Sequence, residues 1–97
     1  MTDERTYSQD AVRDVAARIL EVHAQVTQAL KGGERALRDF ASDEKQHPAA
    51  RRAVAEWLAR APAAPWGMAE VVQVFAAVGN AVRIAELERL GQSPDRE

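Results

Sequence analysis

Residues 68–90 constrain the fold most, because apolar side chains cover more than one face of this segment. The segment contains no proline and one glycine, and its apolar residues recur every three or four positions, as in a helix. They form two stripes, Met68, Val71, Phe75, Val78, Val82 and Ala85, and Val74, Ala77, Ala81, Ile84 and Leu87. A surface helix of a small domain needs only one stripe. We therefore expect this helix to be buried on two sides, by its own chain and by another chain.

The rest of the sequence predicts three more helices and no strand. The four predicted helices are residues 8–31, 34–41, 48–61 and 68–90. Ser8 is a suitable N-cap for the first, and Gly32-Gly33 can end it with a left-handed residue. Pro48 suits the first turn of the third helix, where its missing N–H is not needed. The stretch from Pro62 to Pro65 is expected to be a stiff, extended connector.

These segments predict a single all-α domain spanning residues 1–97, with frayed ends at residues 1–7 and 92–97. The first and last helices are long, and the two short helices together cover a similar span. The expected bundle of four helices is therefore a long helix, a broken return and a second long helix, in an up-down-up arrangement.

Composition narrows the classes of function. The chain has 97 residues, no cysteine and a net charge of -2. Disulfides and thiolate metal sites are excluded, and the charge gives no electrostatic argument for nucleic acid or for an anionic membrane. No uninterrupted run approaches the ~20 apolar residues that span a bilayer. We expect a cytoplasmic protein, and the excess of arginine over lysine with abundant alanine is typical of GC-rich bacterial genomes.

The polar residues show no catalytic, cofactor or metal signature. His23 and His47 have no spacing relation to each other, and boundary or surface positions are expected for both. Three acid–base pairs spaced by four suggest helical ion pairs rather than a site, namely Asp14–Arg18, Glu34–Arg38 and Glu56–Arg60. Because no nucleophile with a base and no phosphate loop is present, we predict that the protein is not an enzyme and needs no cofactor.

Gly79-Asn80 conflicts with the helix predicted around it, because glycine in a helix interior costs about 1 kcal/mol relative to alanine. A kink at Gly79 is one interpretation. The other is close helix packing, which small neighbours such as Ala76, Ala77 and Ala81 would permit. The apolar spacing continues in phase through Gly79, which favours close packing in a continuous helix.

The leading functional hypothesis is a helical module for protein–protein interaction or regulation. It would act as a homodimer or as a small subunit of a larger assembly, through the apolar face of the C-terminal helix. The candidate partner-binding residues are Trp66, Val71, Val74, Phe75, Val78, Gly79 and Val82. Trp66 has a second interpretation, which the scarcity of aromatic residues favours: it folds back and caps the bundle. Trp57, at helical spacing, is expected in the core.

Two alternatives remain open. A DNA-binding transcriptional regulator would use the helix that begins near Pro48, with Arg51, Arg52 and Arg60 as contacts. The turn before that helix is long, lacks glycine and includes two acidic residues, all of which count against this interpretation. A small-molecule site between helices is the third hypothesis, since such a site needs only an apolar lining and a few polar groups.

Overall fold

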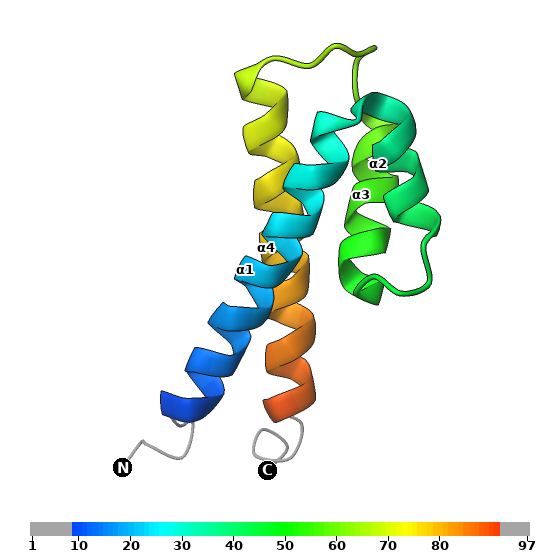
Figure 1. Cartoon of the computed structure of the whole chain (residues 1–97). Helices are drawn as coiled ribbons and strands as arrows, with labels where there is room; N and C mark the ends of the chain where they lie inside the picture. Colours follow the sequence, from blue (N-terminus) through cyan, green and yellow to red (C-terminus); the bar gives the residue numbers. More distant parts are fainter. Residues whose placement is uncertain (1–8, 92–97) are drawn as a thin grey trace.

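The computed structural model describes residues 9–91, which form four α-helices and no strand (Figure 1). The helices are α1 (Gln9–Lys31), α2 (Gly33–Ser42), α3 (Pro48–Arg60) and α4 (Met68–Gly91). The all-α prediction is confirmed, and each helix end lies within one residue of its predicted position. Ser8 and the two predicted frayed ends lie outside the described residues.

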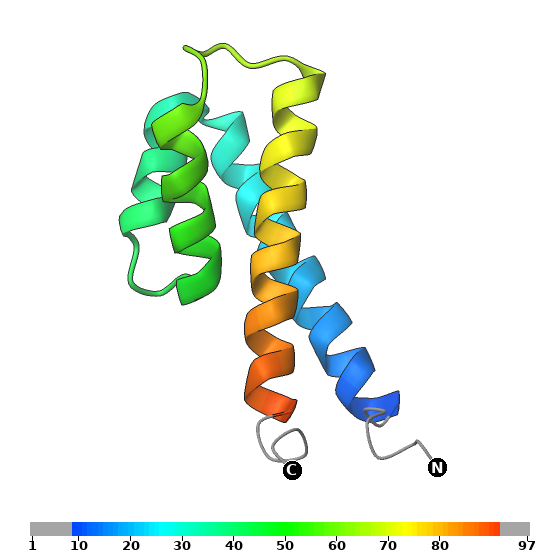
Figure 2. The same cartoon turned by 180° about the vertical axis from the view of Figure 1, so that it is seen from behind.

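The path of the chain contains one reversal more than the expected up-down-up arrangement. The chain runs up through α1, down through α2, up through α3 and down through α4, so α1 and α4 are antiparallel (Figures 1 and 2). Gly33 takes a positive φ of 87°, which glycine adopts at little cost, where α1 gives way to α2. The loop of residues 43–47 is short, as is typical between antiparallel neighbouring helices. The two short helices are therefore a hairpin and not a single broken return.

The core lies where the hairpin of α2 and α3 packs against the upper parts of α1 and α4. Each helix contributes apolar residues at helical spacing, and alanines on α3 let the helices approach closely. The buried cluster is Val22, Val26, Leu37, Phe40, Ala50, Ala53, Val54, Trp57, Val74, Val78 and Val82. Trp57 is among these residues, as expected.

The two long helices extend beyond the hairpin. At 1.5 Å per residue, α1 and α4 are about 35 Å long, whereas α2 and α3 are about 15 and 20 Å. The N-terminal half of α1 and the C-terminal two fifths of α4 therefore leave the bundle as a pair (Figure 1). We call residues 9–20 with residues 82–91 the two-helix arm. Because only two helices meet there, much of the arm's surface cannot be covered by the same chain.

Helix α4 is continuous through Gly79-Asn80, and the glycine accommodates a histidine from α1. A Cβ atom at Gly79 would lie 3.1 Å from Nε2 of His23. The imidazole donates from Nε2 to the carbonyl oxygen of Phe75 at 3.2 Å and meets the Phe75 ring edge to face at 5.1 Å. The predicted continuity of the helix and the boundary position of His23 are confirmed, but the predicted close approach of two helix backbones at Gly79 is wrong. A ring, rather than a second backbone, fills the space.

The connector between α3 and α4 folds back instead of running extended. The Trp66 indole donates from Nε1 to the carbonyl oxygen of Pro62 at 2.9 Å. Its ring packs edge to face on Trp57, with centroids 5.0 Å apart. The Ala64–Pro65 peptide bond is cis. Trp66 thus covers the end of the core, which confirms the second of its two interpretations.

By length and composition, α4 is also the one helix among residues 9–91 that could cross a membrane. This corrects the expectation that no segment is apolar over a length that spans a bilayer. The expectation considered only uninterrupted apolar runs, whereas a helix with a few charged residues can still be long and apolar enough. A core helix passes the same test. Val74, Val78 and Val82 of α4 are fully buried by the other helices. Only 17% of the apolar window of α4 is buried, however, so α4 differs from a core helix that is mostly buried.

Candidate interaction surface

The predicted partner-binding residues on α4 are mostly turned toward their own chain. Val74, Val78 and Val82 have no exposed surface. These three residues cannot contact a second chain while the protomer is folded, so the structure corrects their assignment. The remaining four, Trp66, Val71, Phe75 and Gly79, are half-buried. Of these, Trp66 and Phe75 pack against the core cluster, and Gly79 faces His23.

Other apolar side chains are exposed, and of the five large ones three lie on α4 and two on α1. The large exposed residues are Val12 (53%), Leu20 (69%), Met68 (76%), Val72 (55%) and Ile84 (49%). On α1, exposed apolar residues recur every four positions as Val12, Ala16, Leu20 and Ala24. Side chains spaced by four lie one above the other on a helix. This row was missed because sequence analysis placed the unburied apolar surface on α4.

A groove of about 310 Å³ lies between α1 and α4 on the two-helix arm. Five of the six residues that line it are apolar, and the sixth is an arginine. They are Val12, Val15, Ala16, Ile19, Arg83 and Leu87. Leu20 continues the row of Val12 and Ala16 beyond the groove. We call the six lining residues, which do not include Leu20, the apolar groove.

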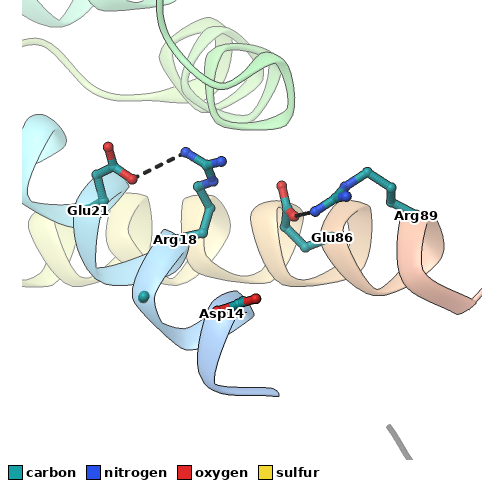
Figure 3. Close-up of a pocket in the computed structure, with 6 residues that line it drawn as sticks. Asp14, Arg18, Glu21, Glu86 and Arg89 are labelled. Carbon is teal, nitrogen blue, oxygen red and sulfur yellow. Dashed lines mark hydrogen bonds and ion pairs between the residues drawn. The ribbon is translucent and has the colours of Figure 1, made fainter. Parts of the chain in front are cut away.

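A second groove between the same helices is polar and faces the hairpin (Figure 3). Asp14, Ala17, Arg18, Glu21, Glu86 and Arg89 line it. Its charges largely neutralise one another, with Arg18 to Glu21 at 3.2 Å and Arg89 to Glu86 at 2.6 Å. The two grooves are lined by different faces of α1. Since the polar groove faces the hairpin, the apolar groove lies on the side of the arm that faces away from the hairpin.

One of the three predicted ion pairs is formed. Glu34 accepts from Arg38 at 2.7 Å. Arg18 pairs with Glu21 in place of Asp14, since residues three apart are neighbours on a helix just as residues four apart are. Among the described residues, Glu56 and Arg60 make no ion pair. Exposed pairs of this kind contribute little to stability.

Glu86 is the one buried charged residue among residues 9–91, and it joins the hairpin to the arm. It continues the buried row of Val74, Val78 and Val82 at the point where the core ends. His47, the N-cap of α3, accepts the Ala49 N–H on Nδ1 at 3.1 Å. The other ring nitrogen, Nε2, therefore carries the hydrogen and donates to Oε2 of Glu86 at 2.8 Å. Both nitrogens of His47 are engaged, so the ring has none left to act as a base or metal ligand.

This contact predicts a pH dependence of stability. Hydrogen bonds from Arg89 and then from His47 lower the pKa of Glu86 below its ordinary value of 4.5, against the opposing effect of burial. The unfolded chain thus binds a proton more readily than the folded one, and Glu86 stabilises the fold above about pH 4.5. We expect thermal melts of the wild type to lose stability as the pH falls below that value. Glu86→Gln should be less stable at pH 7 by about 1–3 kcal/mol and less sensitive to acid. Equal sensitivity of the two proteins would contradict this assignment.

Of the three arginines in the DNA-binding alternative, Arg51 and Arg52 line one shallow surface pocket with Ala41, Pro48 and Ala55, and Arg60 is not among the residues of that pocket. Arg51 donates from Nε to the carbonyl oxygen of Ala41 at 3.2 Å and so satisfies the end of α2. Arg52 and Arg60 are exposed on α3. Helices α2 and α3 lie side by side and antiparallel (Figures 1 and 2). The helices of a helix-turn-helix cross at a steep angle instead.

Comparison of the chain with family models, with curated proteins and with solved structures gives no match. The fold places the chain in the class of small all-α bundles. It has four helices, of which α1 and α4 extend beyond the other two. Within residues 9–91, no three His, Asp or Glu side chains converge in a way that could hold a metal ion. The feature with the clearest capacity to bind is therefore the apolar groove.

Proposed function

We propose that this protein is a non-enzymatic helical interaction module that acts as a homodimer or as a small subunit of a larger assembly. The observation that carries the proposal is the apolar groove with the exposed row of Val12, Ala16 and Leu20 beside it. Soluble monomers rarely expose contiguous apolar patches of substantial size, and such patches mark interaction sites. The surface differs from the one expected from the sequence, because α1 contributes four of the six groove residues and α4 only two.

The mechanism is burial of apolar surface. A helix laid along the groove would cover Val12, Ile19 and Leu87 and would shield Leu20 from water. Burial contributes roughly 25 cal/mol per Å², from which the costs of association must be subtracted. The alanines in the row keep the surface shallow, so the backbone of a second helix can approach closely. A helix in a groove between two helices is a recurrent mode of recognition.

Leu20→Gln is expected to weaken association strongly without unfolding the chain, because Leu20 is exposed and glutamine is a good helix former. The matched control is Ala17→Gln, on the same helix but in the polar groove. Sedimentation equilibrium of the purified chain measures self-association. A photo-crosslinking amino acid at position 20 or 17 in cells reports any other partner. We expect adducts or oligomers that depend on position 20 and not on position 17.

A folded chain that stays monomeric at high concentration, and that gives no adduct specific to position 20, would refute the proposal. Equal effects of the two glutamine variants would also refute it, because the polar groove is not the proposed surface. Circular dichroism of both variants establishes that each one is folded before association is compared.

A further inference from the structure

We infer that the apolar groove receives an acidic amphipathic helix of another protein rather than a second copy of this chain. This inference rests on the proposed function and names the chemistry of its partner. The evidence is the distribution of charge on the two-helix arm, in which the two grooves differ.

The carboxylates of Asp14, Glu21 and Glu86 all line the polar groove, where arginines accompany them. None of the six residues of the apolar groove is acidic. Its one charge is the guanidinium of Arg83, which among residues 9–91 contacts the side-chain oxygen of Asn80 at 3.3 Å and pairs with no carboxylate. The groove thus offers an apolar lining with an uncompensated cation at its edge.

This arrangement disfavours a symmetric dimer through the groove. In a two-fold interface the same patch meets itself, so every group contacts only members of that patch. Arg83 would then face apolar side chains or the Arg83 of the second copy. Covering a guanidinium without a carboxylate is costly, and placing like charges together adds to the cost.

An acidic amphipathic helix would complement both the apolar lining of the groove and the charge of Arg83. Apolar side chains at positions spaced by three and four would lie against Val12, Ile19 and Leu87. A glutamate or aspartate at the edge of that stripe would reach Arg83 and form a charge-assisted hydrogen bond. The lining from Val12 to Ile19 spans about two helical turns, so a helix of three or four turns is long enough.

The test uses the full chain as bait for a displayed library of 16-residue helix-forming peptides. Leucines are fixed at a spacing of three and four, and the flanking positions allow glutamate, glutamine or lysine. We expect wild-type bait to enrich glutamate next to the leucine stripe, and Arg83→Glu bait to enrich lysine there. The best peptide, made synthetically, should bind Arg83→Gln about threefold to fivefold more weakly. It should bind Leu20→Gln about tenfold more weakly and Ala17→Gln unchanged.

Enrichment without acidic bias, or the same enrichment on Arg83→Glu bait, would overturn the inference. A library that yields nothing, together with a dimer that Leu20→Gln dissociates, would overturn it while leaving the proposed function intact. If no peptide, no oligomer and no adduct at position 20 is found, both fail.

Discussion

Val78→Asp is expected to leave the chain unfolded. Val78 has no exposed surface and lies in the cluster where all four helices meet. A carboxylate there would lose its hydration without gaining a partner, at a cost of several kcal/mol, and would also remove apolar contacts. A domain of this size has only about 5–15 kcal/mol of stability in total. Circular dichroism at 222 nm and a thermal melt would show the loss directly.

The matched control is Ile84→Asp, on the same helix and half exposed. It should keep the helical signal and melt within a few degrees of the wild type, because its carboxylate stays in water. A folded Val78→Asp protein with an unchanged melting temperature would contradict the packing of α4. Since Val78→Asp acts on folding, any loss of association in that variant says nothing about the interaction surface.

The contrast between Val78 and Ile84 shows what the sequence of α4 could and could not predict. Helical periodicity in the sequence assigned Val78 and Val82 to one stripe and Val74 to the other. The observed buried row, Val74, Val78 and Val82, takes members from both stripes. Periodicity tells which residues share a face, but the faces that are covered depend on where α1 and the hairpin lie. That information is not contained in the helix itself.

The exposed apolar row on α1 was missed for a related reason. With α2 and α3 taken as one broken return, α1 would be covered along its whole length. The observed hairpin is about half as long as α1, so it does not extend far enough to cover the row of Val12, Ala16 and Leu20, which is exposed. The predicted helix lengths already contained this consequence. The missing step was to recognise that the short loop of residues 43–47 favours a reversal.

Glu86 and His47 illustrate a contact that periodicity does not reveal. A charged residue near the end of a helix is ordinarily solvated, and 39 positions separate these two residues. One signal was present, because Glu86 extends the row of Val78 and Val82 by four residues. At Gly79, in contrast, the continuity of the helix was predicted correctly from the unshifted apolar spacing, but the His23 ring that occupies the space beside it was not.

Trp57→Ala is expected to lower the free energy of unfolding by about 3–5 kcal/mol. The indole is almost fully buried, belongs to the core cluster and donates from Nε1 to the Gln73 side-chain oxygen at 3.4 Å. Its ring also supports Trp66 edge to face. Truncation therefore removes a large apolar volume, leaves a cavity and frees the connector between α3 and α4. Urea unfolding followed by circular dichroism measures the loss.

Trp66→Ala is the matched comparison, because it removes the same ring from the other side of the same contact. Trp66 is half-buried and bonds to the carbonyl oxygen of Pro62 within its own connector. Its truncation should cost about 1–2 kcal/mol, since less apolar surface leaves the protein interior. Each variant retains one tryptophan, so fluorescence follows unfolding from both sides of the contact. If Trp66→Ala were as destabilising as Trp57→Ala, the connector and not α3 would hold the upper end of the bundle together.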